Sequence, residues 1–270
     1  MEQRSYVLRS FVVQPVDPLL AFDEAAFVKS ATEFIRRKVE SSGARGVVVG
    51  VSGGVDSSVT ATLCVKAIGS NRVLLLFMPD EITTEEDRRC VSLLSQWLGV
   101  EVREVPITTT VYAFFDLLGR ADRVTEGNLR ARVRMVVLYW FANRERRLVV
   151  GTSNRSEWLT GYFTKYGDGA SDLAPLLTLY KTQVWQLARW LGIPEFIVNR
   201  TPSARLWSGQ EDERELGIRY TILDSVLVRW ERGYDPKAIA SEIEAPLHVV
   251  DRIVKLVQSS SHKRQLPQHL

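Results

Sequence analysis

The strongest constraint on the fold is a short β-branched run that leads through paired glycines directly into a helix. The segment GVVVGVSGG at 46–54 predicts a buried strand, because it is apolar, β-branched and bounded by glycines. Segments of helical length alternate with such runs along the first half of the chain. The predicted strands are residues 46–54, 73–78, 100–107 and 148–150, and the predicted helices are 21–42, 55–68, 84–98, 109–118 and 128–142. This alternation predicts an α/β fold with a doubly wound, mostly parallel sheet and helices on both faces.

The pattern changes in the second half to helices without strands between them. A glycine-rich loop at 161–176 opens this helical C-terminal part. The helices expected after it lie near 178–191, 212–232, 236–243 and 247–258. Because no linker rich in proline, glycine or serine separates the two halves, we expect one domain over 1–270. Its N-terminal extension would be 1–20 and its C-terminal tail 259–270.

Composition excludes several classes of protein. The chain is 45% hydrophobic and 25% charged, which is ordinary for a globular protein, and its net charge of +3 points to no nucleic-acid partner and no membrane partner. The longest apolar stretches, such as 73–78, are far shorter than the roughly 20 residues that cross a bilayer. Residues 1–20 contain no apolar region of signal-peptide length. Two cysteines, Cys64 and Cys90, exclude a disulfide framework, so we expect a cytoplasmic protein.

The loop SGGVDSS at 52–58 indicates the chemistry. Its paired glycines let the backbone approach an anion, toward which the N–H groups of the following helix point. Asp56 is unexpected there, because a carboxylate repels phosphate unless a divalent cation bridges the two. The lysine of a GxxxxGK[ST] loop is absent, which argues against ordinary phosphoryl transfer. The candidate phosphate-binding residues are Gly50, Val51, Ser52, Gly53, Gly54, Val55, Asp56 and Ser57.

The SGGxDS pattern resembles the pyrophosphate-binding loop of the ATP pyrophosphatase family. The resemblance implies that ATP is cleaved between its α- and β-phosphates while this loop holds the pyrophosphate. A carboxylate or amide-type oxygen is adenylated, and a nitrogen or sulfur nucleophile then displaces AMP. The loop alone leaves the substrate open.

Six further motifs narrow the resemblance. They are NLRARVRM (128–135), GTSNRSE (151–157), GYFTKYGDGASD (161–172), PLLTLYKTQV (175–184), PSARLWSGQEDERELG (202–217) and HKR (262–264). In identity and order they resemble the NAD synthetases of the ammonia-dependent type, over roughly residues 25–265. The resemblance implies ATP-dependent amidation of nicotinic acid adenine dinucleotide (deamido-NAD) to NAD with ammonia. The reaction would pass through an acyl-adenylate and release AMP and pyrophosphate.

The strand at 148–150 places the motif that follows it at the carboxyl edge of the sheet. Ligands bind at this edge in open α/β folds, so Thr152 and Glu157 are candidate site residues. By resemblance, Thr152 binds ATP, and Asp56 and Glu157 hold Mg²⁺. Two carboxylates, completed by phosphate oxygens and water, suit the octahedral shell of this ion.

Three more residues receive roles from the resemblance. Lys181 would neutralise the charge that develops at the α-phosphorus, and Ser203 would contact ATP. Asp168 would be catalytic, either holding the incoming ammonia or accepting a proton from it, and these two roles stay open. Amidation needs neutral NH₃, so a desolvated carboxylate nearby is chemically reasonable.

The basic helix at 128–142 indicates the second substrate. On a helical wheel, its predicted buried stripe comprises Leu129, Val133, Val136, Val137 and Trp140. Arg132 lies on one flank, where it can bury its stem and present its guanidinium to an anion. The remaining arginines are mostly expected on a solvated face. By resemblance, the residues that bind deamido-NAD are Arg132, Lys165, Asp172, His262 and Lys263.

The nitrogen source and the assembly also follow from the resemblance. A glutamine-dependent enzyme carries an extra glutaminase domain with a nucleophilic cysteine, whereas neither Cys64 nor Cys90 is N-terminal. Free ammonia, or ammonia passed from a separate protein, is therefore expected, and relatives are homodimers. The loop at 79–89 departs from the arginine- and tyrosine-containing turn of many relatives, which leaves the adenine-side contacts open.

Two alternatives fit parts of the sequence. Eight arginines between residues 120 and 147 would suit a tRNA sulfur-transfer or modification enzyme, although such enzymes usually need paired cysteines. Residues 235–258 resemble a helix-turn-helix pair of a DNA-binding regulator. Two amphipathic core helices explain that segment better, because no dense basic face marks a recognition helix.

Overall fold

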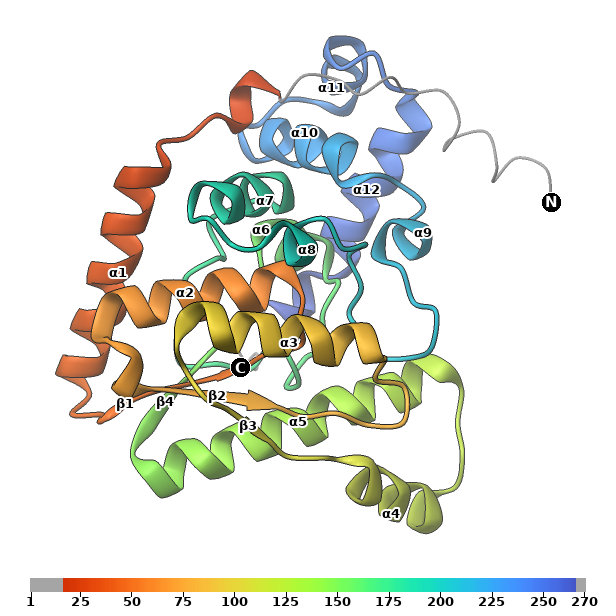
Figure 1. Ribbon diagram of the computed structural model, residues 1–270. Helices are drawn as coiled ribbons and strands as arrows, with labels where there is room; N and C mark the ends of the chain where they lie inside the picture. The colour runs from red at the N-terminus through yellow and green to blue at the C-terminus, as the bar shows by residue number, and fades with distance from the viewer. Residues whose placement is uncertain (1–16, 266–270) are drawn as a thin grey trace, which may run out of the picture.

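The computed structural model describes residues 17–265, and four parallel strands form its centre (Figure 1). The strands are β1 (Gly46–Gly50), β2 (Val73–Phe77), β3 (Val102–Glu104) and β4 (Arg147–Val150). Their order is β3-β2-β1-β4, and the central residue Val48 is in register with Leu74 on one side and Val149 on the other. The predicted parallel α/β sheet is confirmed.

Helices cover both faces of the sheet. The first face is covered by α1 (Glu24–Ser41), α2 (Val55–Ile68), α3 (Glu85–Leu98), α7 (Lys181–Trp190) and α8 (Glu195–Val198), which share a core with Val47 and Val49. On the other face, α4 (Thr108–Leu118) and α5 (Arg123–Glu145) form a second core with Val48 and Val149. Alternate strand residues thus supply alternate cores, as the period-2 geometry of a strand requires. A sheet buried on both sides explains why its strands are almost uniformly apolar.

The C-terminal part has a third core of its own. Its helices are α6 (Arg155–Thr160), α9 (Asp212–Leu216), α10 (Tyr220–Glu231), α11 (Pro236–Glu242) and α12 (Leu247–Ser259). Short 3-10 turns lie at Pro18–Leu20 (η2), Ser70–Arg72 (η3) and Ser261–Lys263 (η4). Helices α11 and α12 bury Ile239, Val250 and Ile253 beside α10 (Figure 1). They are amphipathic core helices, and the DNA-binding alternative has no support.

Several predicted boundaries were wrong for local reasons. The first strand ends at Gly50 instead of 54, and the third keeps only Val102–Glu104 of the predicted 100–107. The single helix expected at 212–232 is two helices, α9 and α10. They are separated at Gly217, which ends α9 in the left-handed region at φ +67°.

Helix starts follow side-chain caps that the predictions overlooked. Helix α5 begins at Arg123, five residues early, because the Asp122 side chain accepts hydrogen bonds from the N–H groups of Val124 and Thr125. Helix α6 was missed altogether. Its start is a capping box in which Asn154 and Glu157 each accept a backbone N–H from the other.

Parts of two other predictions lie outside the described residues. These are residues 1–16 of the N-terminal extension and 266–270 of the tail. Within residues 17–265, no helix is both long and apolar enough to cross a bilayer.

The predicted buried stripe of α5 is correct in part, because Val133 is buried and Leu129 and Val137 pack against the second core. Val136 and Trp140, expected inside, are 59% and 53% exposed. Arg130, expected on a solvated face, is 4% exposed. Its Nε lies 3.2 Å from Asp80 Oδ2, and Arg134 Nη2 is equally close to the same oxygen. The buried side of α5 therefore includes Arg130, which shares the Asp80 carboxylate of the β2–α3 loop with Arg134 and also pairs with Glu81 at 2.6 Å.

This buried cluster generates the first prediction. Asp80→Ala removes the carboxylate from two desolvated guanidiniums, so we expect the free energy of unfolding to fall by about 3–5 kcal/mol in urea denaturation. The matched control is Glu104→Gln, which breaks the exposed 2.9 Å pair with Arg88 and should change stability by less than about 1 kcal/mol. Equal losses in the two variants would contradict the role of Asp80.

Candidate active site

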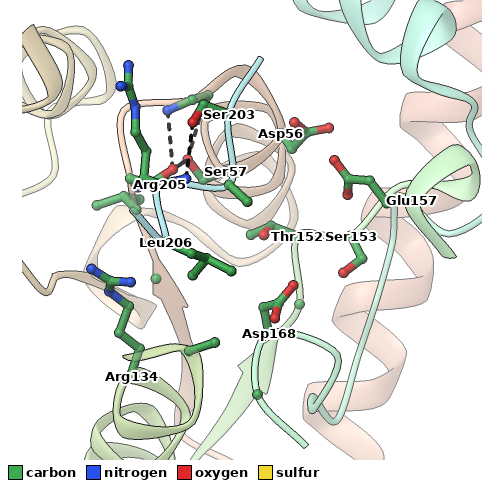
Figure 2. A pocket seen from close by; sticks show the side chains of 18 of the residues that line it. Asp56, Ser57, Arg134, Thr152, Ser153, Glu157, Asp168, Ser203, Arg205 and Leu206 are labelled. Atoms are coloured by element: carbon green, nitrogen blue, oxygen red, sulfur yellow. Dashed lines mark hydrogen bonds between the residues drawn. The ribbon is translucent and has the colours of Figure 1, made fainter. Parts of the chain in front are cut away.

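A cavity lies at the carboxyl edge of the sheet, where the strand order reverses between β1 and β4 (Figure 2). The chain leaves β1 toward α2 and leaves β4 toward α6, and the diverging loops open a crevice between them. Helix α5 and residues 200–206 complete the wall. The predicted edge site is thus a real depression, with contributions from both halves of the chain.

The loop after β1 is closed by its own hydroxyl groups. Ser57 Oγ and Ser58 Oγ donate to the Gly54 carbonyl at 3.0 and 2.9 Å, and the Ser52 N–H donates to Ser57 Oγ at 3.3 Å. Gly54 is the N-cap of α2 and has no side chain to cap the helix. The N-terminal turn of α2 therefore faces the cavity as an anion-binding element.

Gly53 has a supporting role behind this loop. Of the candidate residues 50–57, it alone does not line the cavity. Its φ is +79°, and a Cβ built on it would lie 2.8 Å from Cys90 Cβ and 2.9 Å from the Asp87 carbonyl oxygen. Its own carbonyl accepts a 3.0 Å hydrogen bond from Arg200, which also pairs with Asp87 at 2.6 Å. Close packing of Gly53 against α3 therefore fixes the loop after β1 on the side away from the cavity.

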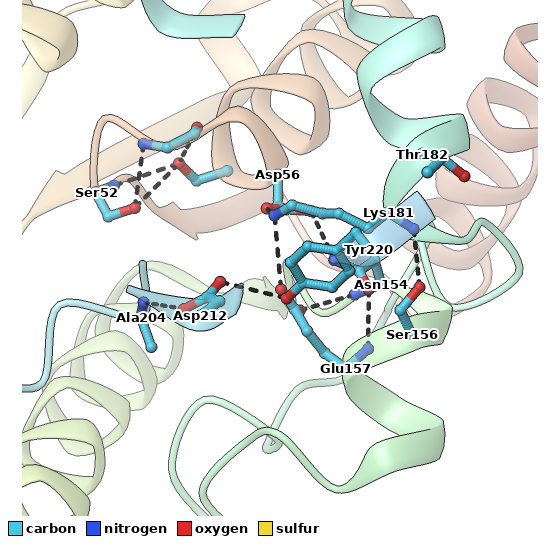
Figure 3. A network of polar contacts seen from close by, with 12 residues as sticks. Ser52, Asp56, Asn154, Ser156, Glu157, Lys181, Thr182, Ala204, Asp212 and Tyr220 are labelled. Atoms are coloured by element: carbon cyan, nitrogen blue, oxygen red, sulfur yellow. Dashed lines mark hydrogen bonds and ion pairs between the residues drawn. The ribbon is translucent and has the colours of Figure 1, made fainter. Parts of the chain in front are cut away.

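The buried side chain of Lys181 on α7 contacts acids on α2 and α6 (Figure 3). The Lys181 ammonium, whose side chain is 3% exposed, donates to Asp56 Oδ2 and lies 3.7 Å from Glu157 Oε1. The other Asp56 oxygen accepts from Asn154 Nδ2 at 2.9 Å. Residues from α2, α6 and α7 thus meet around one charge, and the two predicted metal ligands, Asp56 and Glu157, face each other across it.

The pKa values show that negative charge is in excess here. Burial raises the pKa of Glu157 well above its usual range, and the neighbouring Asp56 carboxylate raises it further. Burial by itself would lower the pKa of Lys181, but Asp56, Glu157 and Asp212 outweigh it and raise that pKa. The lysine therefore stays charged without balancing the surrounding acids.

Such a donor set fits Mg²⁺ brought in with a nucleotide. Two carboxylates with unsatisfied charge are hard oxygen ligands, which this ion prefers together with phosphate oxygens and water. Within residues 17–265, no group of three or more His, Cys, Asp or Glu side chains is placed to hold a metal by itself. Asp56 and Glu157 would therefore need substrate oxygens to complete the shell.

The remaining ATP-side candidates also line the cavity. Thr152 follows β4, and Ser203 lies opposite, where its Oγ accepts the Arg205 N–H at 3.2 Å (Figure 2). Asp168 reaches the cavity from the glycine-rich loop and accepts the Thr164 N–H at 2.9 Å. Its side chain is exposed at the cavity, and the protein mass around it still desolvates the carboxyl group enough to raise its pKa.

Sequence reasoning missed several residues of the cavity wall. Asp212 is 3% exposed and accepts the Ala204 N–H at 3.0 Å and the Tyr220 hydroxyl at 3.3 Å. It lies in the motif at 202–217, but the resemblance implied no role for it. Arg134 and Arg200 were missed as well, because an arginine on a helix or in a loop carries no signal of its own burial.

The predicted dinucleotide-binding residues gather beside the cavity and do not line it. Arg132 Nη2 donates to the Lys165 carbonyl at 3.3 Å, and Lys165 Nζ donates to the His262 carbonyl at 2.8 Å. Lys263 Nζ donates to the carbonyls of Gly161 and Phe163 at 2.8 and 2.9 Å. The glycine-rich loop and the C-terminal turn are thereby joined, and Arg132 is exposed at their junction.

Asp172 is engaged differently from the rest of this group. Its Oδ2 accepts the Val149 N–H at 2.7 Å and its Oδ1 the Tyr139 hydroxyl at 3.4 Å. These contacts tie the glycine-rich loop to β4 and α5. The carboxylate thus orients the loop next to Arg132.

Gly53 provides the second prediction. Gly53→Ala adds a methyl group that must displace α3 as well as adopt a left-handed φ, so we expect more than about 2 kcal/mol of destabilisation in urea. Gly43→Ala is the matched control, because its φ is +67° but nothing lies within 4 Å of the added Cβ. If the two variants are equally stable, the packing beneath the loop has no energetic importance.

The amino-acid sequence is similar to those of known NAD synthases along most of its length. The NAD synthase family model matches residues 27–267. The NH₃-dependent NAD⁺ synthetase of Methanocaldococcus jannaschii is 45% identical over 89% of this chain and 94% of its own, and that of Hyperthermus butylicus 48% identical over 93% and 92%.

Solved structures give the same result. An NMN synthetase from Francisella tularensis matches with a TM-score of 0.82 and 33% identity, over 93% of this chain and 99% of its own. The NH₃-dependent NAD synthetase of Campylobacter jejuni matches with a TM-score of 0.79 and 30% identity, over 93% and 100%. With its loop, its buried lysine and these likenesses, the chain belongs to the NAD synthase family.

Proposed function

We propose that the protein is a carbon–nitrogen ligase that converts deamido-NAD to NAD with ATP and ammonia, releasing AMP and pyrophosphate. The observation that carries this proposal is the buried Lys181 ammonium between Asp56 and Glu157, facing the loop after β1. Chemistry at the α-phosphorus needs positive charge at that point and an anion cradle for the leaving pyrophosphate. Membership in the NAD synthase family supports the same reaction.

In the first step, the nicotinate carboxylate oxygen would attack the α-phosphorus of ATP, and the bond to the β-phosphate oxygen would break. Lys181 would stabilise the negative charge that builds on the α-phosphoryl oxygens. Mg²⁺, held by Asp56 and Glu157, would neutralise the pyrophosphate. The ATP-binding residues are Gly50, Val51, Ser52, Gly53, Gly54, Val55, Asp56, Ser57, Thr152, Lys181 and Ser203, with Gly53 acting from behind the loop.

In the second step, the nitrogen of NH₃ would attack the acyl carbon, and the bond to the AMP oxygen would break. Asp168 lies at the cavity with a raised pKa, so it suits both holding ammonia and accepting the proton that the new amide loses. Arg132, Lys165, Asp172, His262 and Lys263 would bind deamido-NAD at the junction beside the cavity. No element of this scheme needs a glutaminase.

Three features of the whole protein belong to the same proposal. The cavity draws on the strand-bearing half and on the C-terminal helices, so the chain would work as one domain. The thiols of Cys64 and Cys90 are free and buried, which suits a reducing cytoplasm. Two copies would form a homodimer, as the family resemblance implies.

The neighbouring helices α4 and α5 offer the surface for this dimer. They carry large apolar side chains that are more than half exposed: Leu117, Leu118, Val136 and Trp140. Exposed apolar surface on paired helices is typical of protein interfaces. Val136 and Trp140 lie on the same helix as Arg132, so the second substrate would bind near the partner subunit.

The decisive experiment is incubation with ATP, Mg²⁺, ammonium and deamido-NAD. We expect NAD, AMP and pyrophosphate in equal amounts, whereas ADP with orthophosphate would refute the proposal. A parallel reaction supplies nicotinic acid mononucleotide in place of the dinucleotide, because one similar structure is an NMN synthetase. A higher kcat/KM for the mononucleotide would keep the reaction type and replace the substrate.

Asp56 gives the third prediction. Asp56→Asn removes one metal ligand and the partner of Lys181, so we expect AMP formation to fall about 10³-fold while the fold is retained. Steady-state assays and circular dichroism check both points. Glu33→Gln, an exposed acid on α1, should turn over normally. Near-normal turnover of Asp56→Asn would remove this carboxylate from the mechanism.

Arg132 gives the fourth prediction. Arg132→Ala should raise KM for deamido-NAD about tenfold or more and leave KM for ATP within about twofold, because one charged hydrogen bond is lost on one substrate only. Arg37→Ala, an exposed arginine on α1, serves as the control for loss of charge. Equal effects on both substrates would assign Arg132 elsewhere.

The dimer surface gives the fifth prediction. Trp140→Glu places a charge in the apolar surface of α5 and should shift sedimentation from a dimer to a monomer. Trp190→Glu replaces a similarly exposed tryptophan on α7, 50% exposed against 53%, and should remain dimeric. An unchanged dimer in Trp140→Glu would exclude this face.

A further inference from the structure

Helix α10 carries two acids, Asp224 and Glu231. Glu231 is exposed, whereas Asp224 is fully buried, with 0% exposure. A carboxylate at such a position is stable only if its oxygens receive hydrogen bonds. Burial raises the pKa of Asp224 to about 6, and hydrogen bonds and the Lys181 charge oppose the rise. The group is therefore mainly a carboxylate at neutral pH and can accept from several donors.

Within residues 17–265, the hydrogen-bond donors to Asp224 come from two helix starts. Oδ1 accepts the Ser156 hydroxyl in the first turn of α6. Oδ2 accepts both the N–H and the hydroxyl of Thr182, each at 2.8 Å, in the first turn of α7. Ser156 Oγ in turn accepts the Lys181 N–H at 2.9 Å. One carboxylate thereby satisfies N–H and hydroxyl groups at two helix N-termini, where backbone donors lack partners inside the helix.

The residues next to these donors are those of the proposed chemistry. Ser156 precedes Glu157, and Thr182 follows Lys181 (Figure 3). Asp224 itself does not line the cavity. Its hydrogen bonds link the first turns of α6 and α7, which carry Glu157 and Lys181.

We propose that Asp224 is a positioning residue that holds the starts of α6 and α7 together, so that Lys181 and Glu157 converge on Asp56. This inference rests on the proposed function, because it concerns the same site. Helix α10 would thus contribute to the chemistry through Asp224, although Asp224 does not line the cavity.

The first test is Asp224→Asn, which keeps the shape but turns one acceptor oxygen into a donor that faces other donors. We expect kcat for AMP formation to fall about 10²-fold, the scale of a misplacement of about 1 Å, while KM for deamido-NAD stays within about twofold. A carboxylate that only stabilised the fold would leave kcat of the folded protein unchanged. Full kcat in Asp224→Asn would overturn the proposal.

The matched control is Asp17→Asn. Asp17 is a largely buried acid, with its side chain 9% exposed, and it pairs with Arg229 of α10 without lining the cavity. We expect this variant to lose stability and keep kcat. A comparable loss of kcat in Asp17→Asn would show that any weakening of α10 impairs turnover, and would overturn the specific role of Asp224.

A double-mutant cycle tests whether Asp224 acts through Lys181. In a Lys181→Arg background the cation is already misplaced, so Asp224→Asn should add less than about a threefold loss. A full further 10²-fold loss would overturn the proposal. If Asp224→Asn does not fold, Ser156→Ala takes its place in both tests, with an expected kcat loss of about tenfold.

The wild-type protein in the same assay separates the two proposals. If it forms neither AMP nor NAD from deamido-NAD, the proposed function fails. If it turns over normally while the Asp224 and Ser156 variants keep full kcat, only the positioning role fails.

Discussion

The site depends on one buried ammonium group that three helices must meet. Lys181 contributes a positive charge with almost no exposure to solvent, and this charge is stable only because Asp56 and Glu157 lie beside it. Neither acid belongs to the same helix as the lysine. The ion pair is therefore formed only when α2, α6 and α7 have all packed at the edge of the sheet, which couples the chemistry to the completed fold.

The same rule governs other charges buried around the cavity. Arg200 pairs with Asp87 beneath the loop after β1, and Arg130 and Arg134 share Asp80 of the β2–α3 loop. In each case arginine side chains from a distant segment pair with an acid and fix a loop that follows a strand. Buried ion pairs add little net stability compared with apolar packing, but breaking one is costly. They are well suited to holding loops in a single arrangement, which is what a cradle for phosphates requires.

Local patterns made much of the fold and part of the site predictable. Helix α2 was predicted at 55–68 with both ends correct, because a glycine precedes it and Gly69 follows it. The strands were recognised by β-branched runs, and the cavity-lining residues Asp56, Thr152 and Glu157 because each follows a strand closely in sequence. The stripe of α5 was only partly correct, because a helical wheel cannot show that Arg130 pairs with Asp80 and Glu81 in another loop. Asp212 and Asp224 were missed for the same reason.

The sequence by itself determined the strands and most of the helices, which loop faces an anion, and which family the motifs resemble, since these depend on neighbours within a few positions. Only the tertiary structure decided which charges meet. Lys181 and Asp56 are 125 residues apart, and Thr182 and Asp224 are 42 apart. No periodicity links such residues, because their pairing arises from the packing of separate helices around a common sheet and is enforced by the high energy of leaving any one of these charges buried alone.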